Sequence, residues 1–256
     1  MQTLDQVEPS HEAAEKYYPR AGRAIGWLLL MAAVGALAAL LFFFCYGVFM
    51  AAAQPELSPA DIEAMISSQA YNPDVLAGVY VTQFVFLLPI IFWAANFTDQ
   101  RWDKTLAFTR VTGRQVGLWL GIWAVYQLLA GVMHTLVDVP ADAFTQAMGE
   151  RFHWPMFLVI VLLAPLLEEL IFRGYMFKAL RHSWLGLAGT LLVTSVLFVL
   201  LHVGQYNLWL LIQLAVFSVI LGLARECTGS IFTPWLLHAV NNLVSYVALL
   251  FLGASL

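Results

Sequence analysis

Residues 155–180 read PMFLVIVLLAPLLEELIFRGYMFKAL, an apolar run that contains Glu168, Glu169 and Arg173. A membrane-spanning helix needs about 20 predominantly apolar residues at about 1.5 Å of rise per residue, and this run is long enough. Ionisable side chains are costly to insert into a membrane and mark a functional site by default. The run therefore predicts a transmembrane helix that carries buried polar chemistry.

The rest of the chain has the same membrane character. Of its 256 residues, 61% are hydrophobic and 11% are charged, whereas about a quarter of the residues of an average soluble domain are charged. The apolar runs predict an all-α, polytopic transmembrane helical bundle of about seven spans, at residues 24–52, 76–97, 115–136, 155–180, 185–203, 207–224 and 231–252. We divide the chain into a cytoplasmic polar tail (1–22), N-terminal transmembrane helices (23–150) and the helices that carry the candidate catalytic motifs (151–256).

Lysine and arginine are distributed unevenly between the two sides of this bundle. The loops expected on the opposite side from the N-terminus contain Arg151 alone. The side of the N-terminus has Lys16, Arg20, Arg23, Arg101, Lys104, Arg110, Arg114, Lys178, Arg181 and Arg225. Cationic loops favour the cytoplasm, so we expect a cytoplasmic N-terminus and a C-terminus outside. The stretch from Thr98 to Arg114 is expected either at the membrane interface as an amphipathic segment or in solution as a positive loop. The net charge of −4 has no basic tract behind it, which gives no support for nucleic-acid binding.

The three ionisable residues of the span at 155–180 differ in their expected partners. Glu169 and Arg173 are four residues apart, so they share a helix face and can pair. Glu168 points roughly 100° away and has no local partner, which leaves it available as a general base in a low-dielectric environment. The alternative for Glu169 and Arg173 is an ion pair that only stabilises helix packing.

Two later segments carry further polar residues at helical spacing. The sequence FVLLHVG places Phe198 and His202 on one face, and WLLHAVNN places His238 and Asn242 on one face. Counted from the turn near Ser183, the depths of Glu168 and His202 differ by only about 6 Å, whereas the His238 and Asn242 pair is expected to lie shallower by roughly 5–10 Å. A tilt or an earlier start of the last helix would bring all of them together.

Glutamate, two histidines and asparagine, without a serine, cysteine or aspartate partner, indicate water activation rather than a covalent nucleophile. In a metal-free scheme, Glu168 and His202 deprotonate a water while His238 and Asn242 donate hydrogen bonds to the oxyanion. In the alternative scheme Glu168, His202 and His238 bind zinc, although the chain has no H-E-x-x-H motif. We favour no metal cofactor, because asparagine is a common oxyanion donor and an uncommon zinc ligand.

The three motifs E-E-x-x-x-R, F-x-x-x-H and H-x-x-x-N resemble those of the CPBP family, the CAAX proteases and bacteriocin-processing enzymes related to type II CAAX prenyl proteases. The resemblance covers roughly residues 155–250. It implies an intramembrane endopeptidase that acts on a peptide or a prenylated protein. By position it implies Glu168 as the catalytic glutamate, His202 as its partner on the water, and His238 with Asn242 at the oxyanion. The supporting residues would be Glu169, Arg173 and Phe198.

The resemblance leaves several properties open. Family members have been called metalloproteases, yet the eukaryotic ones look like glutamate-type proteases. Eukaryotic members remove the last three residues of prenylated CAAX proteins, and bacterial members are linked to bacteriocin maturation, self-immunity or regulatory proteolysis. The short loops resemble those of a bacterial member in the inner membrane. The rival interpretations are a proton-coupled transporter and a non-catalytic peptide-binding immunity or scaffold protein.

Overall fold

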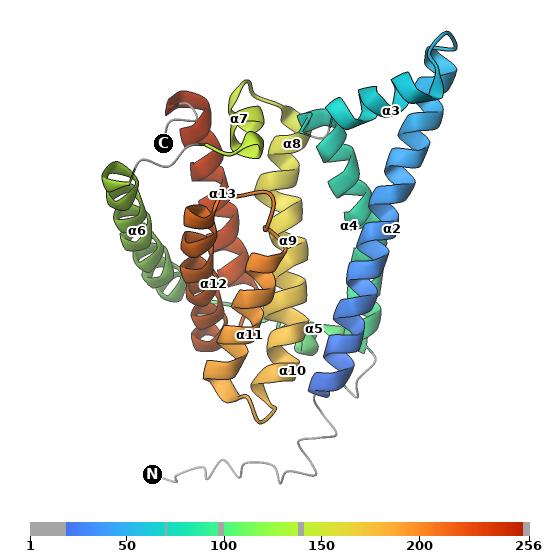
Figure 1. Ribbon diagram of the computed structural model, residues 1–256. Helices are drawn as coiled ribbons and strands as arrows, with labels where there is room; N and C mark the ends of the chain where they lie inside the picture. The colour runs from blue at the N-terminus through green and yellow to red at the C-terminus, as the bar shows by residue number, and fades with distance from the viewer. Residues whose placement is uncertain (1–18, 70, 97–99, 138–140, 253–256) are drawn as a thin grey trace, which may run out of the picture.

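The structure is a computed structural model that describes residues 19–69, 71–96, 100–137 and 141–252, and these ranges consist of helices joined by turns (Figure 1). Six helices within these described ranges are long and apolar enough to cross a membrane. They are α2 (Ala21–Ala53), α4 (Pro73–Asn96), α6 (Gly113–Leu136), the continuous helix from α8 to α10 (Trp154–Arg181), α12 (Leu208–Thr228) and α13 (Phe232–Leu252). No strand occurs in the described ranges, so the predicted all-α bundle of an integral membrane protein is confirmed. Residues 1–18, most of the expected polar tail, lie outside the described residues.

The remaining elements are short. They are α3 (Pro59–Ser68), α5 (Trp102–Thr105), α7 (Ala143–Gly149) and α11 (Gly186–Leu200). Figure 1 shows the start of α2 and the end of α13 at opposite ends of the bundle. This arrangement requires an odd number of chain passages, which the six long helices and the shorter α11 supply within the described residues.

The expected span at 185–203 is shorter than predicted. Helix α11 has 15 residues and is about 22 Å long, which is less than the thickness of the hydrocarbon core. The chain turns after Leu200 because Gly204 adopts φ +88° and Asn207 caps the next helix, accepting a hydrogen bond from the Leu210 N–H at 3.0 Å. His202 therefore lies in a turn rather than within a helix, and Figure 1 shows this turn at mid-height in the bundle.

The helix from Trp154 to Arg181 is not a regular α-helix throughout. It consists of α8 (Trp154–Leu158), the π-helical η1 (Val159–Leu163), α9 (Ala164–Glu169), the π-helical η2 (Leu170–Met176) and α10 (Phe177–Arg181). In η1 the Ala164 N–H bonds to the Val159 carbonyl, five residues back. The next donor in this register would be Pro165, which has no N–H, so the Ile160 carbonyl has no helical partner there. Proline thus leaves an acceptor inside the bundle.

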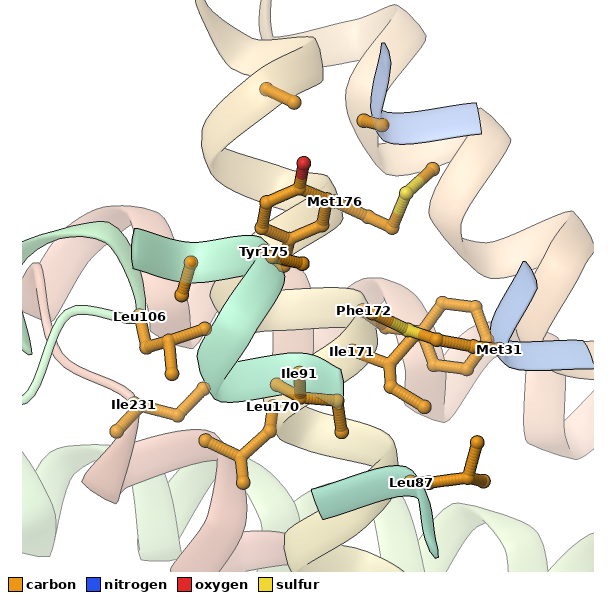
Figure 2. Packing of buried hydrophobic residues seen from close by; sticks show 14 of the residues in the cluster. Met31, Leu87, Ile91, Leu106, Leu170, Ile171, Phe172, Tyr175, Met176 and Ile231 are labelled. Atoms are coloured by element: carbon orange, nitrogen blue, oxygen red, sulfur yellow. The ribbon is translucent and has the colours of Figure 1, made fainter. Parts of the chain in front are cut away.

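The largest group of buried apolar side chains surrounds η2. Figure 2 shows residues of η2 against side chains from α2, α4 and the two loops that carry Leu106 and Ile231. All residues of η2 are buried, and Phe172, Tyr175 and Met176 are each 1% exposed. The helix that carries Glu168 and Glu169 is therefore the central helix of the bundle, which restricts how its polar side chains can move.

Residues 98 and 99 of the stretch from Thr98 to Arg114 lie outside the described residues, and its central part is packed against protein. Leu106 is fully buried, and Ala107 is buried with φ +58°. The Ala107 carbonyl accepts a hydrogen bond from the Ile231 N–H at 2.9 Å, and the Ser230 hydroxyl donates to the Thr109 carbonyl at 2.6 Å. This part is not a solvated loop, because its backbone pairs with the turn between α12 and α13; a position at the membrane interface stays a prediction. This pairing covers that turn with protein.

Candidate active site

Glu169 and Arg173 form a fully buried ion pair. The Arg173 Nη1 donates to Glu169 Oε1 at 3.0 Å, and both side chains are 0% exposed. The Arg173 Nη2 donates to the carbonyl and hydroxyl oxygens of Ser218 on α12, at 3.0 and 2.7 Å. The guanidinium also lies 4.7 Å from the centroid of the Phe198 ring. The pairing expected from the spacing is present, and a second helix holds the arginine in place.

His238 lies between the two neighbouring glutamates. Its Nδ1 is 2.9 Å from Glu169 Oε1, and its Nε2 is 3.8 Å from Glu168 Oε2. An ionised carboxylate only accepts hydrogen bonds, so Nδ1 carries the proton toward Glu169. The side chain of Glu168 is 19% exposed, whereas that of Glu169 is fully buried. Glu169 thus orients the imidazole, and the more accessible Glu168 faces its other nitrogen.

The depth difference expected between His238 and Glu168 is absent. Helix α13 begins after a turn whose Ser230 and Ile231 are 0% and 2% exposed. Because residues 107–109 pair with this turn and cover it, α13 starts inside the bundle rather than at its surface. The deeper start brings His238 level with the two glutamates.

The Phe198 ring contacts both histidines. It is fully buried, with centroid distances of 5.0 Å to the His202 ring and 5.7 Å to the His238 ring. The His202 Nδ1 is 2.9 Å from the Phe198 carbonyl, which can only accept, so Nδ1 carries the proton and Nε2 is left as an acceptor. No hydrogen bond or ion pair joins His202 to Glu168 among the contacts of the described residues. His202 is therefore connected to His238 only through the contact that each ring makes with Phe198 among these interactions.

Asn242 reaches the central helix through the carbonyl that Pro165 leaves without a helical partner. Its Nδ2 donates to the Ile160 carbonyl at 2.9 Å. An amide nitrogen carries two N–H groups, so one remains for another acceptor. The π-helical turn that contains Ile160 therefore places Asn242 beside the helix of the two glutamates.

Several residues near the site were not predicted. Gln205, in the turn that carries His202, donates to the Tyr80 hydroxyl of α4 at 2.9 Å, and Tyr206 stacks on the His202 ring with centroids 5.7 Å apart. Tyr80 lies in an ordinary apolar segment, which offered no signal, whereas Tyr206 follows His202 by four residues, the same spacing that placed Phe198 and His202 on one face. For Asn241, the position directly beside Asn242 in the sequence was a signal that it could lie near the site.

The zinc alternative can be compared with this arrangement. Within the described part of the chain, no three histidine, cysteine, aspartate or glutamate side chains converge closely enough to hold a metal ion together. In the set Glu168, His202 and His238, both histidine rings contact the Phe198 ring, and each histidine uses its Nδ1 in a hydrogen bond. In their present side-chain conformations, the three residues do not form a zinc-binding site.

The fold and this cluster define a class, a polytopic helical membrane protein with a buried glutamate and histidine site. Residues 150–244 match the family model described as type II CAAX prenyl endopeptidase Rce1-like. The match confirms the CPBP and CAAX-protease resemblance of the motifs.

One curated relative has no described activity. It is an Escherichia coli protein described as "Uncharacterized 24.3 kDa protein", with 35% identity over 136 residues. The aligned region covers 49% of this chain and 61% of that relative, so the chain spans less than two thirds of the relative's length. No solved structure matches the chain.

Proposed function

We propose that this protein is an intramembrane endopeptidase that hydrolyses a peptide bond of a membrane-associated or prenylated substrate with a glutamate-activated water. The observation that carries the proposal is the position of His238, which Glu169 orients at 2.9 Å and whose free nitrogen faces Glu168 at 3.8 Å. A base whose partner is itself oriented by a third group is the arrangement that enzymes use to activate a nucleophile. The Rce1-like match over residues 150–244 supports the reaction type.

Glu168 acts as the general base. It removes a proton from the water as the water oxygen bonds to the carbonyl carbon of the substrate. The same carboxyl group then returns the proton to the amide nitrogen as the carbon–nitrogen bond breaks. Its partial exposure, in contrast to the fully buried Glu169, is what makes it accessible to a substrate and a water.

His238 balances the charge of the site. Ionised Glu168 and Glu169 together with Arg173 leave one negative charge among buried groups, which is costly in a low-dielectric environment. One additional proton, shared between Glu168 and the His238 Nε2, brings these four groups to zero. With the proton on Nε2, His238 donates a hydrogen bond to the water or to the oxyanion. The Glu169 carboxylate stabilises this charged form through Nδ1.

Asn242 and His202 have complementary hydrogen-bonding roles. The second N–H of the Asn242 amide donates to the oxyanion that forms on the substrate carbonyl. His202 has its proton on Nδ1, so its Nε2 accepts a hydrogen bond and orients the attacking water beside Glu168. These assignments keep the four residues that the sequence motifs indicate.

We also propose that the protein resides in a bacterial inner membrane with its N-terminus in the cytoplasm. Figure 1 shows the start of α2, helix α5 and the end of α10 at one end of the bundle, and these elements contain the basic residues Arg23, Lys104, Lys178 and Arg181. His182 does not add to this charge at neutral pH, because burial and the nearby Lys178 and Arg181 lower its pKa to about 4. A positive end favours the cytoplasmic side.

Purified protein should cleave members of a library of prenylated and unprenylated membrane peptides, as detected by mass spectrometry. Because we propose a metal-free reaction, cleavage should continue after strong chelation and should not increase when zinc is added back. A metal-dependent peptidase would instead lose activity on chelation and recover it with stoichiometric zinc. Binding without cleavage would favour the scaffold alternative, and Glu168-dependent ion flux in liposomes would favour a transporter.

The turn that carries His202 offers a more local prediction. Gly204 has φ +88° and open space around its Cα, so Gly204→Ala introduces backbone strain of roughly 1–2 kcal/mol without a steric clash. We expect kcat to fall about tenfold, because the strain shifts His202 relative to the water. The measurement is steady-state cleavage together with a thermal melt in detergent.

Gly186→Ala is the matched control for that variant. Gly186 also has a positive φ, +58°, and open space around it, but it lies at the distant start of α11. The two variants should lose similar thermal stability, and only Gly204→Ala should lose activity. Wild-type kcat in Gly204→Ala would show that the geometry of this turn does not influence the reaction.

A further inference from the structure

A line of polar contacts connects α6 with Asn242. The Trp123 Nε1 donates to Asn241 Oδ1 at 3.1 Å, and the Asn241 Nδ2 donates to Asn242 Oδ1 at 3.4 Å. The Asn242 Nδ2 then donates to the Ile160 carbonyl at 2.9 Å. Trp123 lies outside the region that matches the family model, residues 150–244. A helix from the unmatched half of the chain is thus tied to a residue of the candidate site.

The direction of this line is set by its two ends. An indole N–H can only donate, so the amide oxygen of Asn241 must face Trp123. A backbone carbonyl can only accept, so the amide nitrogen of Asn242 must face Ile160. Both ends require the same orientation of the two amides, with the Asn241 N–H directed at the Asn242 oxygen. The second N–H of Asn242 is the donor that remains.

The packing of α6 supports the same connection. Trp123 and Tyr126 belong to an apolar cluster in which α6 packs against α12 and α13. The Tyr126 hydroxyl also donates to the Gln213 carbonyl of α12 at 3.2 Å. Many other apolar side chains of α6 are exposed, among them Leu118, Val125 and Leu128. The hydrogen bonds of Trp123 and Tyr126 therefore lie on the side of α6 that packs against α12 and α13.

We infer that Trp123 and Asn241 are positioning residues that fix the Asn242 amide with one N–H available to the oxyanion. The inference rests on the proposed peptidase function. The terminal torsion of an asparagine is roughly two-fold, so an unrestrained amide can present its oxygen as readily as its nitrogen. An oxygen in that place would repel the developing negative charge. Fixing the donor before the reaction is what makes such a hydrogen bond effective in the transition state.

The test is a set of kinetic measurements on purified full-length protein with a cleavable peptide identified from the library. Trp123→Phe keeps the aromatic packing and removes the indole donor, so kcat should fall about fivefold with KM unchanged. Asn241→Asp keeps the acceptor for Trp123 but places an oxygen against the oxygen of Asn242. Its kcat should fall further, by about tenfold or more.

A second background separates positioning from a structural role. In Asn242→Ala, the donor that Trp123 positions is gone, so adding Trp123→Phe should change kcat by less than about twofold. A purely structural role would lower kcat by the same factor in both backgrounds. Tyr126→Phe is the matched control, because it also removes a hydrogen bond of α6 but does not act through Asn242. Its kcat should equal that of the wild type.

The possible failures can be told apart. If the wild-type protein cleaves no peptide, the peptidase proposal is overturned and this inference with it. If the wild type is active but Trp123→Phe lowers kcat equally with and without Asn242, only this inference is overturned. An equal loss in Tyr126→Phe and Trp123→Phe would also overturn it, since general loosening of α6 would then explain both.

Discussion

Glu168→Gln is expected to abolish peptide cleavage while the protein still folds. Glutamine has almost the same shape as glutamate but cannot take a proton from water, and positioned general bases contribute about 10²- to 10⁴-fold to rate. We therefore expect kcat to fall by at least about 10²-fold. Thermal stability should change little, because the side chain is 19% exposed and its partner atom on His238 lies at 3.8 Å.

Two matched substitutions make this result specific. Glu169→Gln makes the same change one residue later, but it removes the charge that pairs with buried Arg173 and orients His238. It should lower both activity and melting temperature. Glu63→Gln, on the exposed helix α3, should change neither. Cleavage by Glu168→Gln within tenfold of the wild-type rate would rule out Glu168 as the base.

The fold was largely predictable because hydropathy is a local property. Each long apolar run needed only its own composition to indicate a span, and the observed helices begin and end near the expected residues. The exception was α11, whose length depends on the turn at Gly204 and the cap at Asn207. Both residue types favour turns, so the sequence did contain a signal for an early end of that helix.

The candidate site was predictable only within single helices. The Glu169–Arg173 pair followed from a spacing of four residues, and the structure contains it. The contact of His238 with both glutamates depends on how deep α13 begins, which residues 107–109 determine by pairing with a turn more than a hundred positions away. No local pattern encodes that distance. The catalytic roles of Glu168, His202, His238 and Asn242 stay predictions.

Pro165 shows how a sequence feature acquires meaning from tertiary structure. A proline inside a membrane helix predicts a backbone carbonyl without a helical partner, but not what will satisfy it. Here the acceptor is Ile160, and the donor is Asn242 from the last helix. The residue that interrupts the helix thus positions a candidate catalytic side chain. This connection requires α13 to start deep in the bundle.

Arg173→Ala should be the most destabilising of the variants considered. Removing one partner of a buried ion pair leaves the other charge uncompensated, which typically costs about 3–5 kcal/mol. Here Glu169 would keep only the hydrogen bond from His238, and Ser218 would lose the donor to its hydroxyl and carbonyl oxygens. We expect a low folded yield from membranes, a melting temperature in detergent well below that of the wild type, and no measurable cleavage.

Arg181→Ala provides the comparison on the same helix. Arg181 also pairs with a glutamate, Glu226, at 2.8 Å, but its side chain is 37% exposed, and such pairs contribute only about 0–1 kcal/mol. Its loss should hardly change yield. Adding Glu169→Gln to Arg173→Ala removes the buried unpaired charge and should recover part of the melting temperature without recovering activity, because His238 is no longer oriented. If Arg173→Ala melted like Arg181→Ala, burial of the pair would contribute nothing to stability, and Glu169 would have to be held in its ionised form by His238 alone.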